Sequence, residues 1–277
     1  MSSLVVNTNL SAIAAYNNLN ATDSNMSQAI QELSSGLAIQ TAADGPAAYV
    51  QSQALESQAN GYEQAIANAQ DGVSLVQTAS GALNQISSIL QTMNQLAISS
   101  ANGATNDSTS LQANQQEFLA LQSDINQIAS TTSYGTTNLL DGSFSNQVLQ
   151  VGAFAYGSQQ INFSIEGASA GALGVGTSAA SVGTAAAASA AINLVQAAIA
   201  SVDAIEAQVG AIQNELQAIA ANLTVGQQNL SAANSQLVDV NMAQEMTVFS
   251  TDQILMQTGT AMLAQAQQAP ALVEKLI

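Results

Sequence analysis

Cations are almost absent from this sequence. Its 277 residues include 18 Asp and Glu but one Lys, Lys275, and neither Arg nor His, so the formal net charge is −17 at pH 7. We expect no nucleic-acid partner, because neutralising phosphates requires several Lys or Arg side chains. The same shortage argues against binding to an anionic membrane surface.

Cysteine is absent as well, which excludes disulfides, thiolate metal sites and a thiol nucleophile. The missing His removes the commonest general base and metal ligand. The carboxylates are widely spaced, as is typical of solvated surface charge, and no glycine-rich phosphate-binding motif occurs. We therefore expect no catalytic residues, no cofactor and no metal site.

Long apolar runs are rare. The N-terminal stretch MSSLVVNTNL lacks a basic region followed by an apolar one, so it is not a conventional secretory signal. The one candidate for a membrane span, Ala185–Val202, is mostly alanine, is interrupted by Asn193 and Gln196, and has no flanking cations. This pattern predicts an Ala-rich helix and no membrane insertion.

Apolar residues at helical spacing dominate the first half of the chain. Gly36 suits the left-handed position that ends a helix, and Pro46 suits the first turn of the next one. The turn-forming stretch 102–110 predicts a further break. The three expected apolar stripes are Leu19, Met26, Ile30, Leu33 and Leu37; Tyr62 to Met93 in steps of three and four; and Leu111, Phe118, Leu121, Ile125 and Ile128.

The composition changes in the stretch from Tyr134 to Phe163, which contains half of the aromatic residues. Apolar residues alternate with polar ones there, which predicts short strands in one or two hairpins. The low-complexity stretch 167–187 that follows is uncharged and predicts a flexible surface loop. From Val195 to Val240 apolar residues recur every three or four positions, which predicts a coiled-coil seam.

The two ends of the chain carry broad apolar faces and few charges. Either these ends pair with each other, or they form an interface with other subunits, which the spacing favours slightly. The residues expected at a polymerisation interface are Leu10, Ile13, Leu19, Met26, Ile30, Leu33, Ile254, Leu255, Met262, Leu263, Leu272 and Leu276.

Several ordered motifs resemble the bacterial flagellins. QELSSGLAIQTAADGPAAY (31–49) resembles the family's Glu-Arg-Leu-Ser-Ser-Gly-Leu-Arg-Ile-Asn turn, and residues 67–102 match its central helix. TTSYGTTNLLDGSF (131–144) resembles the opening of its small β region, and the stretches 7–20 and 249–277 its first and last helices. The resemblance covers residues 1–166 and 190–277.

This resemblance implies a mainly α fold: a long antiparallel helical bundle with a small β-hairpin region and paired termini. Residues 1–41 and 243–277 would form an inner coiled-coil filament-core domain, and residues 42–166 and 188–242 a rod-like domain. The loop 167–187 would replace the outer domains of longer relatives. Glycines at 61, 72 and 81 would permit close helix approach, although each costs about 1 kcal/mol in a helix; the alternative is a break at one of them.

The implied function is that of a subunit that polymerises into the extracellular flagellar filament for swimming. Its implied partners are copies of itself, an export chaperone, and the cap and hook-junction proteins. The alternatives are a hook–filament junction protein and a secreted coiled-coil adhesin.

The chain departs from the family by losing cations. Ala38, Ala43, Thr92, Asn94 and Gln127 stand where the family has Arg or Lys. Because carboxylates neutralise near pH 4 whereas Lys and Arg stay charged, such a filament would be nearly uncharged in acid. The hypothesis is adaptation to acidic surroundings; resistance to proteases that cut after Lys or Arg, and divalent cations bridging carboxylates, are the alternatives.

One lost cation belongs to the motif that the flagellin-sensing Toll-like receptor contacts in the family. Leu90, Gln91, Leu96 and Glu117 match that motif, but Thr92 replaces its Arg. Thr cannot form the paired hydrogen bonds of a guanidinium, so the resemblance implies weak receptor activation.

Overall fold

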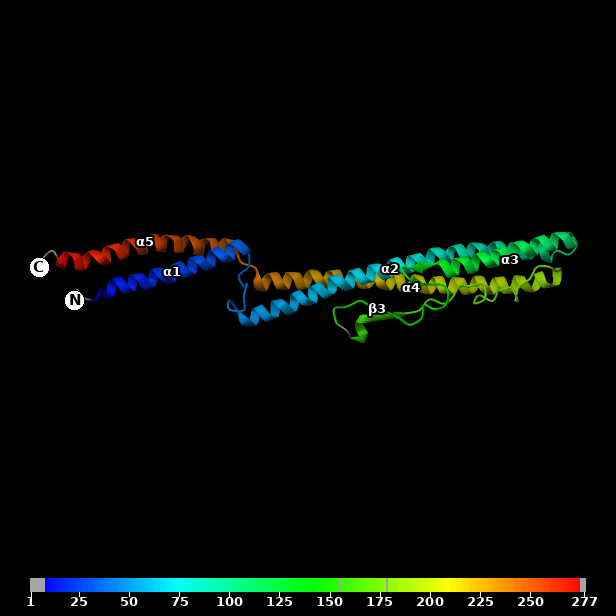
Figure 1. The fold of residues 1–277 in the computed structure, drawn as a ribbon, viewed down its shortest axis with the longest axis horizontal. Helices are drawn as coiled ribbons and strands as arrows, with labels where there is room; N and C mark the ends of the chain where they lie inside the picture. Colours follow the sequence, from blue (N-terminus) through cyan, green and yellow to red (C-terminus); the bar gives the residue numbers. More distant parts are fainter. Residues whose placement is uncertain (1–7, 155, 178, 275–277) are drawn as a thin grey trace. The chain divides into compact units, whose positions relative to one another are not determined.

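The chain forms two compact units, one within Met1–Ser57 and Asn229–Ile277 (unit 1) and one at Gln58–Gln228 (unit 2). The computed structural model describes residues 8–154, 156–177 and 179–274, and side chains in these ranges up to residue 268. Its helices and strands are α1 (Leu10–Ser35), α2 (Pro46–Ala101), α3 (Ser108–Thr131), β1 (Ser133–Tyr134), β2 (Thr137–Asn138), β3 (Gln147–Gln150), η1 (Gly157–Gln159), β4 (Gln160–Phe163), α4 (Ala185–Val238) and α5 (Met242–Glu274) (Figure 1). The predicted mainly α fold with small hairpins is confirmed.

The helices begin and end where the local chemistry requires. Asn9 caps α1 by accepting a 3.0 Å hydrogen bond from the backbone N–H of Ala12. Gly36 ends α1 with a φ of +78°, a left-handed conformation that glycine adopts without strain. Pro46 opens α2, and Asp107 caps α3 through the backbone N–H of Ser110 at 2.7 Å.

Unit 1 is built on the pairing of α1 with α5 (Figure 1). The two helices run antiparallel: the Asn9 side chain donates to the carbonyl of Ala266 at 2.7 Å, and Leu19 lies against Gly259. Very little is buried by this pairing. Among the described residues of unit 1, the only buried hydrophobic side chains are Ala29 and Val238.

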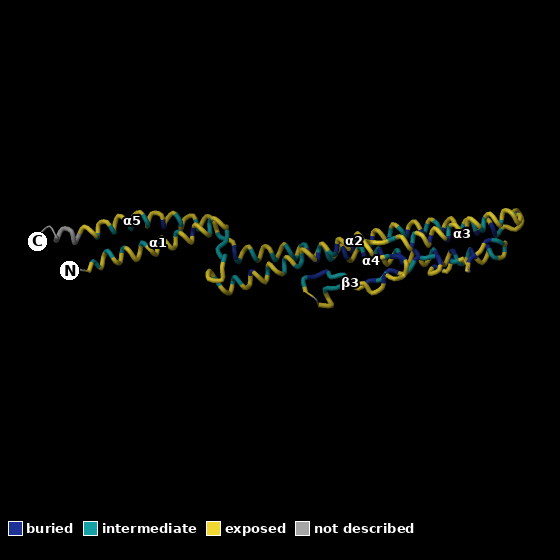
Figure 2. The backbone as a smooth tube through the Cα atoms, viewed as in Figure 1, coloured by how far each residue is buried: buried dark blue, intermediate teal, exposed yellow. Residues whose placement is uncertain are grey.

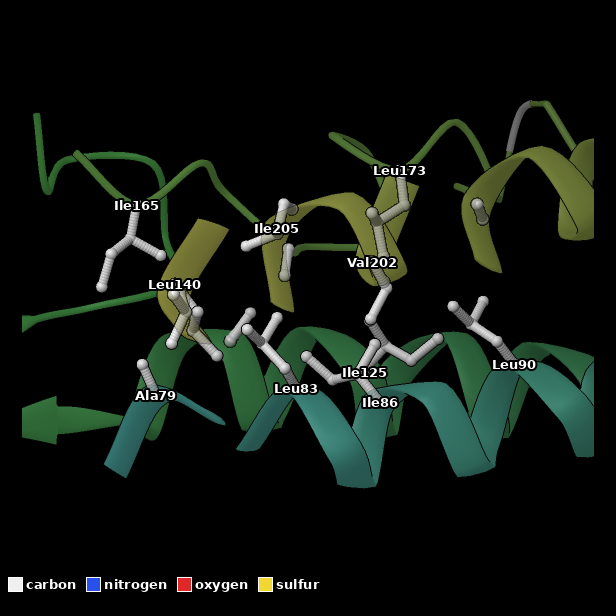
Figure 3. Packing of buried hydrophobic residues seen from close by; sticks show 14 of the residues in the cluster. Ala79, Leu83, Ile86, Leu90, Ile125, Leu140, Ile165, Leu173, Val202 and Ile205 are labelled. Atoms are coloured by element: carbon white, nitrogen blue, oxygen red, sulfur yellow. The ribbon is translucent and has the colours of Figure 1, made fainter. Parts of the chain in front are cut away.

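Unit 2 contains the hydrophobic core. Side chains from α2, α3 and α4 meet there, with Leu83, Ile125 and Val202 among the fully buried ones (Figure 3). Figure 2 shows the contrast, since buried residues gather on α2, α3 and α4 whereas α1 and α5 are almost wholly exposed or intermediate. The predicted apolar stripe of α4 is buried from Val195 to Leu223, except for Ile199 and Ile219, which are half-buried.

Two antiparallel hairpins lie between α3 and α4 in the sequence. Strand β1 pairs with β2, and β3 pairs with β4 in the register Gln147↔Phe163 to Gln150↔Gln160. The β3–β4 hairpin adds its inner side chains to the core of unit 2, where the rings of Phe144 and Phe163 pack at a tilt of 53° with centres 5.3 Å apart. The predicted one or two hairpins are therefore confirmed.

The stretch 167–184 differs from the expected surface loop, because it packs into the core of unit 2. The side chains buried there are Ala168, Ala170, Leu173, Val175, Ala180 and Val182. Three side-chain amides on one face of α3 hold its backbone by hydrogen bonds. These run from Gln122 Nε2 to the carbonyls of Val175 (2.7 Å) and Ala180 (3.3 Å), from the Ala170 N–H to Asn126 Oδ1 (3.0 Å), and from the Val182 N–H to Gln115 Oε1 (2.6 Å). The surface loop predicted from composition is therefore wrong, because the side chains that hold this stretch lie more than forty residues away from it in the sequence.

The three glycines of α2, at positions 61, 72 and 81, differ in what surrounds them. Helix α2 is continuous, so none of them marks a break. A Cβ at Gly61 would lie 2.6 Å from Ala153 Cβ, and one at Gly72 would lie 2.6 Å from Leu149 Cδ2, so both permit close approach of the β3–β4 hairpin region. Gly81 has nothing within 4 Å of its Cβ position, so the predicted close approach is wrong there within a single chain.

This difference predicts opposite effects of the same substitution. Gly81→Ala should stabilise unit 2 by about 1 kcal/mol, because it improves helix propensity without a clash. Gly61→Ala should destabilise it by about 1–3 kcal/mol, because the backbone of Ala153 would have to move. Urea unfolding of each variant, compared at an unchanged slope, measures both values. Equal shifts in the same direction would contradict this packing.

Candidate polymerisation surface

The predicted interface residues fall into two groups. Leu19, Met26 and Leu33 of α1 and Leu263 of α5 are half-buried. Leu19 shows why, since it lies against α5 where Gly259 removes a side chain. The alternative that the two ends pair with each other therefore holds for this group.

The second group stays exposed after the helices have paired. Exposure is 74% for Leu10 and 63% for Met262, values that leave most of each side chain in water. The other exposed members are Ile13, Ile30, Ile254 and Leu255. We call this set of six the end-helix surface. Leu272 and Leu276 lie outside the residues whose side chains are described.

Four further apolar residues are exposed on the same two helices, and the sequence prediction missed them as interface residues. They are Tyr16, Met242, Met246 and Val248. Tyr16 lies three residues before Leu19 and continues the apolar spacing of α1, whereas Met242, Met246 and Val248 lie well before Ile254 on α5. Exposed apolar side chains in this number favour a contact surface for another protein or copy.

The carboxylates of the turns and caps favour their charged forms. The pKa of Asp44 is lowered mainly by the backbone N–H of Thr41, which donates to it at 2.8 Å. The pKa of Asp107 is lowered by the backbone N–H of Ser110, and that of Asp141 by the hydroxyl of Ser143. Their stabilising contribution is present above the usual pKa of 3.8 and is lost as the pH falls through the lowered values.

Glu245 in α5 behaves in the opposite way. Burial raises its pKa above the usual 4.5, and the carboxylates of Glu32 and Asp252 raise it further. A group of this kind stabilises the fold below its ordinary pKa, and the contribution is lost as the pH rises through the raised value.

The residues of the receptor motif do not all reach the surface. Gln91 and Thr92 on α2 and Glu117 on α3 are exposed, and Leu96 is half-buried. The prediction that Leu90 offers a contact is corrected, because its exposure is 0% and it packs in the core of unit 2 (Figure 3). The Thr92 hydroxyl bonds to the carbonyl of Ser88 in its own helix at 3.1 Å.

Within the described parts of the chain, no group of three or more Asp, Glu, His or Cys side chains is arranged to hold a metal ion. Among those residues α4 is the one helix long and apolar enough to cross a membrane. Its apolar stripe instead lines the core of unit 2.

The comparisons with known proteins agree with this architecture. The profile of the bacterial flagellin N-terminal helical region matches residues 6–145, and that of the C-terminal helical region matches residues 192–277. The flagellin of Halalkalibacterium halodurans is 36% identical over 274 residues, covering 99% of this chain and 100% of that one. The chain belongs to the bacterial flagellin family.

Other relatives are longer. The B-type flagellin of Pseudomonas aeruginosa is 42% identical over 171 residues, which are 62% of this chain and 34% of that protein. Flagellin B of Vibrio cholerae is 45% identical over 148 residues, which are 53% of this chain and 39% of that protein. The match thus spans little more than a third of these relatives.

Two solved structures share the fold. The crystal structure of Bacillus cereus flagellin superposes with a TM-score of 0.51 at 28% identity, covering 61% of this chain and 94% of that one. A structure described as a putative flagellar hook-associated protein from Vibrio parahaemolyticus has a TM-score of 0.58 and covers 71% of this chain and 100% of that one. Its 13% identity supports likeness of fold alone.

The burial of Leu90 yields a prediction about stability. Leu90→Ala should destabilise unit 2 by about 2–5 kcal/mol, because it leaves a cavity in the core. Thr92→Ala should change the free energy of unfolding by less than about 0.5 kcal/mol, because its side chain is exposed. Denaturant midpoints of the two variants decide the matter. A Leu90→Ala variant as stable as the parent would place this residue at the surface.

Proposed function

We propose that this chain is a structural subunit that polymerises into the bacterial flagellar filament and has no catalytic role. The observation that carries the proposal is the imbalance of burial between the two units. Unit 2 has a core of its own, whereas unit 1 leaves the end-helix surface in water. Because the chain belongs to the flagellin family, the expected partner of this surface is another copy of the chain in a filament.

A surface of this kind favours repeated assembly. Leu10 and Ile13 lie near one end of α1, and Ile254, Leu255 and Met262 lie along α5, so the apolar residues are spread along the helix pair. When one patch binds a different patch on the next copy, the contact repeats without closing, which produces a helical filament. Each copy would bury side chains that the single chain cannot bury.

The difference in burial between the two units suggests how the domains are organised in the filament. Residues 1–41 and 243–277 would form the inner filament-core domain, and residues 42–166 and 188–242 the surrounding rod-like domain. The stretch 167–187 would stand where longer relatives carry outer domains. The site of action would be extracellular, in the filament, with an export chaperone and the cap and hook-junction proteins as further partners.

Two rival functions predict different products. A hook–filament junction protein would share the terminal helices, and the fold similarity to the putative hook-associated structure is compatible with that role. The match of one flagellin over 99% of this chain favours the filament subunit instead. A secreted coiled-coil adhesin is the third candidate. Electron microscopy of the purified chain separates them, because only the filament subunit should form long uniform fibres alone.

We further propose that the shortage of cations tunes assembly to acidic surroundings. With one Lys and 18 Asp and Glu, the polymer loses most of its charge when the carboxylates are protonated. The shifted pKa values limit the pH range in which these groups stabilise the fold. Glu245 stabilises it below its raised pKa. Asp44, Asp107 and Asp141 stabilise it above their lowered pKa values. Protease resistance and divalent bridging remain the competing explanations.

Removing apolar groups from the end-helix surface should weaken polymerisation. The double variant Leu255→Ser and Met262→Ser loses two side chains worth about 1.5–3 kcal/mol each when buried. The critical concentration for assembly should rise about 10²–10⁴-fold. Sedimentation of polymer from monomer measures it, and Val225→Ser, an exposed residue of unit 2, is the matched control. An unchanged critical concentration in the double variant would remove the basis of the proposal.

Assembly should depend on pH in a defined window. We expect the highest polymer yield at about pH 4, between the raised pKa of Glu245 and the lowered values of the capping carboxylates. Yield is measured from pH 2 to 8 at low salt, because salt screens surface charge. A yield that stays constant over this range rejects acid tuning and leaves the filament proposal intact.

The receptor prediction concerns Thr92. We expect the parent chain to activate the flagellin-sensing Toll-like receptor weakly, and Thr92→Arg to raise the response in reporter cells by restoring a guanidinium. Thr92→Lys is the control that adds charge without the planar donor group. A parent response equal to that of an ordinary flagellin would contradict the interpretation.

A further inference from the structure

The dipeptide Asn-Gly occurs twice in this chain, at Asn60–Gly61 and at Asn102–Gly103. Both asparagine residues are exposed, so contact with water does not distinguish them. The difference lies in the backbone. Asn60 and Gly61 are inside α2, whereas Asn102 directly follows Ala101, the last residue of α2, in the turn that leads to α3.

An Asn-Gly pair can lose ammonia without an enzyme. The backbone nitrogen of the glycine gives its proton to a base and attacks Cγ of the asparagine, which has no Cβ on the glycine to obstruct it. The new C–N bond closes a succinimide ring, and the Cγ–Nδ2 bond breaks as ammonia leaves with a proton. Water then opens the ring at either carbonyl and yields aspartate or isoaspartate. Water is the only co-reactant, and no atom is oxidised or reduced.

The Asn102 side chain is free to react in this way. Within the described parts of the chain it forms no hydrogen bond, whereas the nearby Asn106 is held by donating from Nδ2 to the carbonyl of Ser99 at 2.6 Å. The Gly103 N–H donates to the carbonyl of Ala101 at 3.0 Å, which links residues two apart in an exposed turn. Such a bond opens more easily than one inside a long helix.

The helix protects Asn60 from the same reaction. The Gly61 N–H lies inside a helix of 56 residues, where it is committed to the helical hydrogen-bond pattern. A Cβ at Gly61 would lie 2.6 Å from Ala153 Cβ, so the backbone of α2 is also closely packed at this point. Ring closure at Asn60 therefore requires local opening of α2.

We propose that Asn102 is a site of spontaneous deamidation and that Asn60, in the same dipeptide, is protected. Each event places a carboxylate at the C-terminal end of α2, where the partial negative charge of the helix disfavours an anion. Isoaspartate also adds a carbon to the backbone beside Gly103, whose Cβ position lies 3.4 Å from Ala185 Cβ, so the turn shifts against the start of α4. Because the Gly103 nitrogen must lose its proton, the reaction is slow in acid. It occurs within a single chain and does not depend on filament formation.

Incubation of the unassembled full-length chain at pH 4 and at pH 8, followed by peptic digestion and mass spectrometry, tests the proposal. Pepsin is used because the sequence has one Lys and no Arg, so trypsin would not separate the two sites. At pH 8 Asn102 should react at least about tenfold faster than Asn60, because Asn60 reacts only in the small fraction of molecules in which α2 is open. At pH 4 the reaction at Asn102 should be much slower. Fragmentation by electron transfer should find both aspartate and isoaspartate at this position.

Two comparisons isolate the cause of the difference. In urea-unfolded chain neither dipeptide has a fixed backbone, so Asn60 and Asn102 should react at similar rates. Gly103→Ala should slow the reaction at Asn102 severalfold, because the added Cβ obstructs ring closure. The spacing of 3.4 Å to Ala185 leaves room for this Cβ, so the variant should fold.

Equal rates at Asn60 and Asn102 in the folded chain would overturn the proposal. An Asn102 that stays unmodified at pH 8, although it reacts in urea, would overturn it too. An unchanged rate in Gly103→Ala would exclude attack by the Gly103 nitrogen and have the same consequence. Microscopy scores assembly separately, so an absence of filaments would count against the proposed function alone.

Discussion

The feature on which this structure depends is the inability of α1 and α5 to bury their own apolar side chains. A two-helix pair has one seam, and here that seam is narrow, since Ala29 is the one buried hydrophobic residue on the two helices among those described. A helix in water gains most of its stability from packing an apolar face. The remaining apolar groups therefore need a partner surface, and copies of the same chain supply one in every neighbouring position of a polymer.

Unit 2 shows how the same sequence forms a stable core without ion pairs. Its helices meet through Leu, Ile, Val and Ala, and polar contacts are made by neutral amides such as Gln122 and Asn126. Surface ion pairs contribute little to stability, so their loss is tolerated there. Charge matters more in unit 1, where carboxylates approach one another across the helix pair. The shortage of cations thus leaves neighbouring carboxylates unneutralised in unit 1, whereas the core of unit 2 does not depend on cations.

Much of the fold could be read from local chemistry. Gly36, Pro46 and the turn-forming stretch 102–110 mark helix ends through local backbone requirements, and the apolar spacing from Val195 onward marks the long helix α4. The wrong predictions concern residues whose burial depends on parts of the chain that are distant in the sequence. The stretch 167–184 is buried because α3 supplies amides to its backbone, and Leu90 is buried although the residue after it is exposed. Exposure of single interface residues likewise depends on the register between α1 and α5, which the spacing of either helix alone does not fix.

Methionine oxidation tests the central claim most directly, because the chain carries natural probes on both kinds of surface. Met246 and Met262 are exposed on α5, whereas Met93 is buried in unit 2 and serves as an internal control. Dilute peroxide should oxidise Met246 and Met262 readily in unassembled chain and slowly in polymer, while Met93 stays unreactive in both. Equal oxidation of Met246 and Met262 in the two samples would show that assembly does not cover α5, and the account would be wrong.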